Sequence, residues 1–407
     1  MTTNAQAISA APPQQETASL TERLELFALL ALFGVAGFLQ FSIAIAQLLL
    51  TFAVLFWLLL SLFGHERFET PRFFWPLLAY GGMTLVSAAF SSNRAASFID
   101  SKQLVLFLLV PVAYRLLTNR RGSLMLTVVM SLGGASAAFG IFQYGLLHFD
   151  QLSQRPQGTL GHYMTYAGLL MLVIGVALAK MLFGKGERLW AALLMPALVM
   201  AVALTSTRTA WVGVCAAAAV LFMLKDFRLL AILPILAAVT FAAAGPTITQ
   251  RLMSTFDRKD PTRLDRLAMI REGGRMVRAH PLVGVGPNMV KERYAEYRDS
   301  GAIKDVNPHL HNVPVQIAAE RGLPALIIWI GFIVVLTRDL WRLFKTGENR
   351  VLVTTALAAV ASMLAAGLFE YNFGDSEFLM TFLVLVTLPF AAARDIDPAR
   401  AAATPHA

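Results

Sequence analysis

Charge is scarce in this chain. Asp, Glu, Lys and Arg make up 14% of its 407 residues, whereas 57% are hydrophobic. A water-soluble globule of this length needs more surface charge, so the composition excludes that class and predicts a membrane protein. Cysteine is nearly absent as well, and the single Cys215 excludes an intramolecular disulfide. The N-terminal stretch lacks a basic segment leading into a short apolar core, so we expect no removable signal peptide.

Apolar runs predict an all-α polytopic membrane protein with about twelve transmembrane helices, since about 20 apolar residues span a bilayer core. The predicted spans are residues 23–39, 42–64, 73–90, 103–118, 124–148, 160–183, 188–205, 209–224, 229–245, 324–343, 351–369 and 377–393. The predicted organisation is a tail (1–22), transmembrane helices 1–9 (23–245), a loop with short helices (246–323), transmembrane helices 10–12 (324–393) and a second tail (394–407).

Lys and Arg gather in alternate short loops, which predicts the orientation, because such loops stay in the cytoplasm. The basic loops hold Arg67, Arg72, Arg120, Arg121, Lys180, Lys185, Arg188, Lys225, Arg228, Arg338, Arg342, Lys345 and Arg350. Both tails are therefore predicted to be cytoplasmic and the large loop periplasmic. Within that loop Arg271, Arg275 and Arg278 would form one basic helix face, which either rests on anionic groups or is simply solvated.

The most polar cluster borders an apolar run, in NPHLHNVPVQIAAERGLP at 307–324. Asn312 is predicted to cap a short helix that ends at Gly322, before Pro324 begins a membrane span. His311 then lies at the outer mouth of the helix bundle, just before a helix N-terminus. An imidazole can accept a proton near neutral pH, although a solitary histidine at this place is also explained by hydrogen bonding at the membrane interface.

Two further outer segments carry arginine at membrane depth. Arg208 lies in TSTRTAWVG (205–213), and Arg155 lies in QRPQGTLGHYMTYAG (154–168) together with His162. An arginine there either snorkels to the interface or faces a cavity, a partner or an anion. Because arginine forks bind phosphate oxygens in pairs, three converging segments favour an anion with two or more phosphates.

These segments resemble those of the bacterial O-antigen ligases, within the superfamily that also holds O-antigen polymerases and protein O-oligosaccharyltransferases. The resemblance rests on TSTRTAWVG, on DRLAMIREGGRMVRAHPLVGVGP (265–287) and on HLHNVPVQIAAERGLPAL (309–326), with some twelve spans and one large loop. By this likeness His311 is the essential histidine, and Arg208 and Arg266 are the diphosphate-binding arginines. Ile270 stands where many relatives carry Trp, which leaves Arg263 as the alternative to Arg266.

The resemblance implies a GT-C-like glycosyltransferase of the bacterial inner membrane with a periplasmic active site. It would move O-antigen polysaccharide from undecaprenyl diphosphate to a sugar hydroxyl of the lipid A core, among membrane lipids, without nucleic acid. From its place in a converging outer segment, Arg155 is also expected to bind the diphosphate. The supporting residues would be Arg263, His162, Asn312, Glu320, Glu370 and Asp375, where pairing with an arginine is the alternative for each acid.

No cofactor is implied, and HLH supplies two metal ligands at most, which predicts metal-independent catalysis. Two alternatives stay open within the superfamily: an O-antigen polymerase and a protein O-oligosaccharyltransferase. An alternative of another class is an anionic-substrate transporter or flippase. The lack of repeat symmetry and the gathering of polar residues on one face argue against a transporter.

Overall fold

The structure, a computed structural model, describes residues 19–64, 67–118, 120–151, 153–234 and 261–394. Within these ranges the chain forms helices and loops, which confirms the predicted all-α class. The helices are α1 (Leu20–Phe38), α2 (Ile43–Phe63), α3 (Phe74–Phe90), α4 (Arg94–Asp100), η1 (Ser101–Leu108), α5 (Leu109–Leu116), α6 (Arg120–Leu146), α7 (Tyr163–Phe183), α8 (Arg188–Leu204), α9 (Arg208–Lys225), η2 (Phe227–Ala231), α12 (Pro261–Ala279), α13 (Met289–Glu292), α14 (Tyr294–Tyr297), α15 (Val313–Thr346), α16 (Arg350–Gly367), η3 (Asn372–Gly374) and α17 (Ser376–Ala393).

Eight helical segments of the described chain are long and apolar enough to cross a membrane. They are Ile43–Phe63, Arg94–Leu116, Arg120–Leu146, Tyr163–Phe183, Arg208–Lys225, Val313–Thr346, Arg350–Gly367 and Ser376–Ala393. The helices α3 and α8 are apolar but shorter. Large apolar side chains on these helices are widely exposed, as lipid contact requires. The chain is therefore a polytopic membrane protein.

The predicted count of twelve spans stays a prediction. The first predicted span coincides with α1, whose first turns carry Glu22, Arg23 and Glu25. Glu25 is paired with Arg115 at 3.3 Å and Arg121 at 2.6 Å, so its charge is compensated from α5 and α6. The ninth predicted span, 229–245, lies largely outside the described residues.

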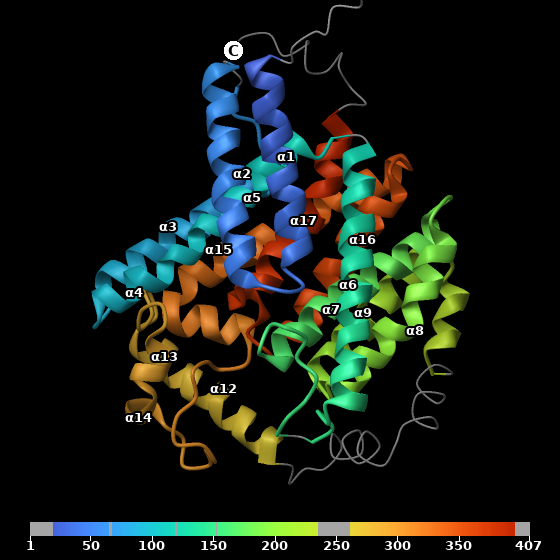
Figure 1. Ribbon diagram of the computed structural model, residues 1–407. Coiled ribbons are helices and arrows are strands. Elements are labelled where there is room, and N and C mark those ends of the chain that lie inside the picture. The colour runs from blue at the N-terminus through green and yellow to red at the C-terminus, as the bar shows by residue number, and fades with distance from the viewer. Residues whose placement is uncertain (1–18, 65–66, 119, 152, 235–260, 395–407) are drawn as a thin grey trace, which may run out of the picture.

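The helices pack around a continuous apolar core to which most of the spans contribute. The helices α1 and α2 form a hairpin at one side, and α12, α13 and α14 lie together at the end of the molecule opposite the start of α1 (Figure 1). The helix α16 packs on α9, α7 and α17, while α15 packs on α3 and α12. This arrangement brings the first turns of α7, α9, α12 and α15 to the same end.

The predicted helix cap at Asn312 and the predicted helix break at Gly322 are confirmed. The Asn312 side chain accepts a hydrogen bond from the Val315 N–H and caps α15, which has proline in its first turn. Gly322 interrupts the helix with φ 83° and ψ 169°, a conformation that strongly favours glycine. The segment 280–286 is hydrogen-bonded to this kink, with the Val285 N–H donating to the Ala319 carbonyl at 2.9 Å. The kink therefore fixes the segment between α12 and α13 onto α15.

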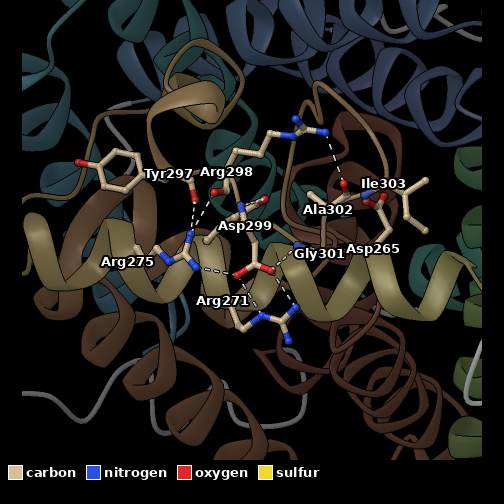
Figure 2. Close-up of polar contacts among 10 residues, drawn as sticks. Asp265, Arg271, Arg275, Tyr297, Arg298, Asp299, Gly301, Ala302 and Ile303 are labelled. Carbon is tan, nitrogen blue, oxygen red and sulfur yellow. Dashed lines mark hydrogen bonds and ion pairs between the residues drawn. The ribbon is translucent and has the colours of Figure 1, made fainter.

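The basic face of α12 has a structural partner. Arg271 donates two hydrogen bonds to Asp299, at 3.1 and 2.9 Å, and Arg275 donates a third at 2.7 Å (Figure 2). The hydrogen bond from Arg271, followed by the one from the Gly301 N–H, lowers the pKa of Asp299 to about 2. The buried Asp299 therefore holds the loop after α14 against α12. It forms ion pairs with two of the three arginines that were predicted to form one basic helix face.

Candidate active site

A cavity of about 460 Å³ lies where the first turns of three helices meet, at the end of the molecule that carries α12. We call it the cationic cavity. It is lined by Arg155, His162, Tyr163, Met164, Ser206, Thr207, Arg208, Thr209, Pro261, Thr262, Asp265, Arg266, Met269, Ile303, Lys304, Pro308, His309 and His311. Residues from five separate parts of the chain thus surround this cavity. Its lining includes three arginines and a lysine but only one acid, Asp265.

The helix directions add to this positive character. The long helices α7 and α9 both begin at the cavity, so their unsatisfied N–H groups and the positive ends of their dipoles face it. Arg208 is the first residue of α9, directly at this end. A helix N-terminus that carries an arginine is a favourable site for a phosphate or diphosphate.

A tight turn sets the position of Arg208. Ser206 adopts the left-handed conformation with φ 53°, which is uncommon for a residue with a side chain. The Thr205 hydroxyl donates to the Val202 carbonyl at 2.7 Å and accepts from the Thr207 N–H at 3.3 Å. The hydroxyl-rich TSTRT sequence therefore reverses the chain between α8 and α9 and places Arg208 at the cavity.

Arg155 reaches the cavity from a loop that α6 holds in place. The Gln143 side chain accepts from the N–H groups of Gln157 and Gly158 and donates to the Gly158 carbonyl at 2.7 Å. The Arg155 guanidinium lies over the Tyr163 ring, 4.0 Å from its centroid. This cation–π contact orients the arginine beside the first turn of α7.

Arg266 and Arg263 both lie on α12 but differ in what they line. Arg266 is partly buried and lines the cationic cavity together with Arg208 and His311. Arg263 is exposed and lines a neighbouring cavity of about 310 Å³. The geometry thus favours Arg266 over Arg263 as the second arginine of a diphosphate site.

The neighbouring cavity has mainly apolar walls, and we call it the apolar cavity. It is lined by Arg208, Thr209, Val212, Thr262, Arg263, Arg266, Leu267, Ile270, Leu310, His311, Leu368 and Phe369. Arg208, Arg266 and His311 border both cavities. A molecule with an anionic head and a hydrocarbon tail can therefore occupy both at once.

His311 is joined to a carboxylate. Its Nδ1 lies 3.0 and 2.9 Å from the two carboxylate oxygens of Glu370, and both side chains are largely buried. The Asn312 side chain donates to the Leu368 carbonyl at 2.9 Å, which holds the loop with Glu370 against the start of α15. With Nδ1–H donating to the carboxylate, Nε2 is the imidazole nitrogen that can accept a proton.

Electrostatics keep this carboxylate ionised. Burial acts to raise the pKa of Glu370, but the hydrogen bond from His311 and the positive charges around it outweigh burial and leave the pKa below its usual value. The adjacent His309 ring makes an edge contact with His311 at 4.1 Å between centroids. Burial, together with the neighbouring His311, lowers the pKa of His309 to about 4, so His309 is neutral near pH 7.

Glu370 also supplies a third candidate metal ligand beside the HLH pair. Ligand atoms of His309, His311 and Glu370 lie within 4.8 Å of one another. Zinc requires ligand distances of about 2.0–2.2 Å from nitrogen and oxygen. In the structure the His311 Nδ1 is hydrogen-bonded to Glu370 at 2.9 Å. The direct pair is thus the arrangement that these residues satisfy as they stand.

Of the other predicted supporting residues, some line a cavity and one is buried away from the cavities. His162 borders the cationic cavity and caps α7, while Asp375 caps α17 and lines a third cavity. Glu320 is buried and pairs with Arg321 at 2.7 Å, and it lines none of these three cavities. Glu320 therefore has the arginine-pairing role that the sequence left as its alternative.

Sequence reasoning missed several residues at the site. Lys304 borders the cationic cavity, and Thr165 and Asn372 border the third cavity. The signal for Thr165 was present, because it lies three residues after His162 in the same outer segment. Lys304 lies in an irregular loop without periodicity, where only the three-dimensional path of the chain brings it to the site.

Comparison with known families agrees with this geometry. No curated protein matches the chain. Residues 190–330 match the family model described as O-antigen ligase, and this stretch includes Arg208, Arg266 and His311. Over this stretch the chain is similar to the O-antigen ligase family, and the match supports a relation to the O-antigen ligase and polymerase superfamily.

Proposed function

We propose that the protein is an O-antigen ligase of the bacterial inner membrane, acting on the periplasmic face. It transfers O-antigen polysaccharide from undecaprenyl diphosphate to a sugar hydroxyl of the lipid A core, without a metal ion. The proposal rests mainly on the cationic cavity. Arg155, Arg208 and Arg266 line it together with His311, which is hydrogen-bonded to Glu370.

In this proposal the arginines hold the diphosphate of the donor. Cleavage of the anomeric carbon–oxygen bond leaves its electron pair on the diphosphate, so negative charge grows there as the reaction proceeds. Fixed guanidinium groups and the N-terminus of α9 bind this charge more strongly in the transition state than in the ground state. They thereby lower the barrier and do the work that a divalent cation does in other diphosphate chemistry.

His311 is the general base in the same scheme. Its Nε2 takes the proton of the acceptor hydroxyl while that oxygen forms a bond to the anomeric carbon. Glu370 stabilises the imidazolium that results and keeps the ring in the required tautomer, as a carboxylate does for a catalytic histidine in hydrolases. Direct attack without an enzyme nucleophile inverts the anomeric configuration, and the products are the extended core and undecaprenyl diphosphate.

The apolar cavity supports a lipid-linked donor. It adjoins Arg208, Arg266 and His311, and its walls include Val212, Leu267 and other apolar side chains that are well exposed. Exposed apolar surface of this kind beside a phosphate site suits an isoprenoid chain, whose burial is favourable in proportion to its apolar area.

A transfer assay tests the proposal. Purified protein in proteoliposomes receives donor and lipid A–core acceptor, and product is followed by electrophoresis with and without excess EDTA. We expect full-length lipopolysaccharide under both conditions. Loss of product on chelation, restored by Mg²⁺ or Mn²⁺, would instead support a metal held by His309, His311 and Glu370. An acceptor treated separately with EDTA controls for effects on lipopolysaccharide itself.

The superfamily also contains polymerases and protein O-oligosaccharyltransferases, and the acceptor separates them. A deletion strain of a ligase keeps long lipid-linked chains and loses them from the lipid A core. A polymerase deletion leaves core that carries a single repeat unit. A transporter or flippase forms no covalent product in the reconstituted assay.

A further inference from the structure

A third cavity, of about 240 Å³, lies beside the cationic cavity between α7, α9, α16 and α17. We call it the acidic cavity, after Glu370 and Asp375 in its wall. The two cavities share His162, Met164, Thr209 and His309. Glu370 faces the acidic cavity while its partner His311 lines the cationic one, so the proposed base and its carboxylate stand between the two spaces.

The two cavities differ sharply in charge. Three arginines and a lysine line the cationic cavity. The described residues that line the acidic cavity include two carboxylates and no lysine or arginine. A diphosphate is repelled by the second set of groups and attracted by the first. The acidic cavity therefore suits a neutral ligand that offers hydrogen-bond donors to carboxylates.

Asp375 is a rigid acceptor in this wall. One carboxylate oxygen caps α17 by accepting from the Phe378 N–H at 2.9 Å, and the other accepts from the Thr165 hydroxyl at 2.5 Å. Each carboxylate oxygen has two lone pairs, so Asp375 keeps acceptor capacity after these two contacts and a further one with the Glu377 side chain. Its position is fixed from two helices, α17 and α7.

Asn372 borders the same cavity and carries an unsatisfied polar atom. Its side chain is 7% exposed, and its amide donates to the Met363 carbonyl at 3.2 Å. Its Oδ1 is buried and has no hydrogen-bond partner among the described residues. A buried polar atom without a partner is costly, and because Asn372 borders the acidic cavity, a rotation of its amide would let a ligand hydroxyl donate to Oδ1.

The remaining walls suit the apolar faces of a sugar ring. Tyr371 and Met164 are partly exposed in this wall, and Phe378 and Met171 lie behind it almost fully buried. Saccharides present hydroxyl groups at the edge of the ring and C–H groups on its faces, so carboxylates, an amide and aromatic rings are matched partners for them.

We propose that the acidic cavity binds the acceptor sugar of the lipid A core, with Asp375 and Asn372 as hydrogen-bond partners of its hydroxyl groups. The inference rests on the proposed ligase function and adds a separate acceptor subsite to it. The bound sugar extends one hydroxyl past His309 toward His311, while the donor diphosphate stays in the cationic cavity. The reacting oxygen and carbon then meet where the two cavities join.

Steady-state kinetics with both substrates varied tests the subsite. The assay uses the full chain in proteoliposomes, undecaprenyl diphosphate-linked O-antigen and lipid A–core lipopolysaccharide that lacks O-antigen. Asp375→Asn removes the charge but keeps an oxygen that caps α17, since Asn and Asp cap helices about equally well. We expect the acceptor KM to rise by about tenfold or more, the loss typical of a hydrogen bond to a charged group. The donor KM of this variant should stay within about twofold of the wild-type value, because the donor makes no hydrogen bond to Asp375.

Two further variants sharpen the test. Thr165→Val removes the hydroxyl that orients Asp375 at nearly constant volume, and it should raise the acceptor KM in the same way. Asp226→Asn changes another helix-capping aspartate, at the far end of α9, and should leave both KM values unchanged. These three results together would support the acceptor subsite.

Other outcomes would overturn it. An unchanged acceptor KM in both cavity variants, or a donor KM that rises equally, would refute the acceptor subsite alone while the ligase function stands. A fall in kcat without a change in the acceptor KM would refute it as well. If wild-type protein forms no product with this acceptor, the ligase function fails, and the acceptor subsite fails with it.

Discussion

At His311 the backbone and the side chain are constrained together. The residue adopts the left-handed conformation with φ 48°, and its Nδ1 is held by Glu370. Such a backbone costs a non-glycine residue about 1–3 kcal/mol, and strain of this size gathers at functional sites. A glycine would relieve the strain but could not accept a proton. The geometry thus favours a histidine whose chemistry is used over one that merely fills the membrane interface.

Replacing His311 tests the general base. We expect His311→Ala to lower kcat by about 10²- to 10⁴-fold while binding of undecaprenyl diphosphate is largely kept, because the arginines hold the diphosphate. His309→Ala should cost much less, since that ring contacts His311 but is not joined to the carboxylate as closely. Turnover and donor binding are measured on both variants. If the His311 variant loses activity only through loss of donor binding, His311 belongs to the diphosphate site instead.

The arginine clamp is tested by charge-conserving changes. Arg208→Lys and Arg266→Lys keep the positive charge but lose the planar fork that binds phosphate oxygens in pairs. We expect each to reduce transfer by about 10²-fold or more, comparable with removal of one donor from a preorganised anion site. Near-full activity in both variants, at wild-type membrane insertion, would remove the diphosphate clamp from the mechanism.

His309 also predicts a pH dependence of stability. Burial lowers its pKa from 6.5 to about 4 in the folded protein. Between these values the unfolded chain binds the proton that the folded protein rejects, so stability falls as the pH drops from about 6.5 to about 4. The slope from one such group is about 1.4 kcal/mol per pH unit at most. Thermal unfolding of wild type and His309→Gln in detergent across this range should show a shallower dependence in the variant. Parallel curves would contradict the prediction.

At the scale of elements, local sequence signals anticipated where α15 begins and bends, but not what holds the bend. Asn312, Gly322 and Pro324 act on their own backbone, so sequence alone predicts the cap and the kink. The bonds that dock segment 280–286 on the kink join distant residues, and no local pattern encodes them. The same reason explains why the basic face of α12 was predicted but its partner Asp299 was not.

Two glycines of α15 provide a matched test of the kink. A Cβ at Gly322 would overlap the Leu282 backbone, and the local φ and ψ disfavour other residues, whereas a Cβ at Gly331 would meet nothing within 4 Å. We expect Gly322→Ala to reduce the free energy of unfolding by about 2 kcal/mol or more. Gly331→Ala should be neutral or stabilising by up to about 1 kcal/mol, as alanine is in a helix. Equal effects in thermal unfolding would show that the kink is not constrained in this way.

Considered whole, the molecule concentrates its unusual polar groups at one end. The helices α12, α13 and α14 lie at the end opposite the start of α1 (Figure 1). Residues of α12 line the cationic cavity, which shares His162, Met164, Thr209 and His309 with the acidic cavity. Composition and apolar runs predicted a helical membrane protein, because the bilayer imposes length and hydrophobicity on each span separately. They could not predict that Glu370 pairs with His311 or that Asp375 meets Thr165, because helix packing decides those contacts.

The distribution of basic residues predicts that this end faces the periplasm, and labelling of single cysteines tests it. In a Cys215→Ser background, Asp305→Cys lies in the loop after α14, where the native side chain is 92% exposed. Glu348→Cys lies at the other end of α15, whose part after Gly322 rises about 1.5 Å per residue and is long enough to cross a hydrocarbon core of about 30 Å. A charged maleimide cannot cross that core. In spheroplasts we therefore expect it to label the cysteine at 305 at once and the cysteine at 348 only after permeabilisation. The reverse pattern would place the cavities in the cytoplasm, where a periplasmic transfer reaction is impossible.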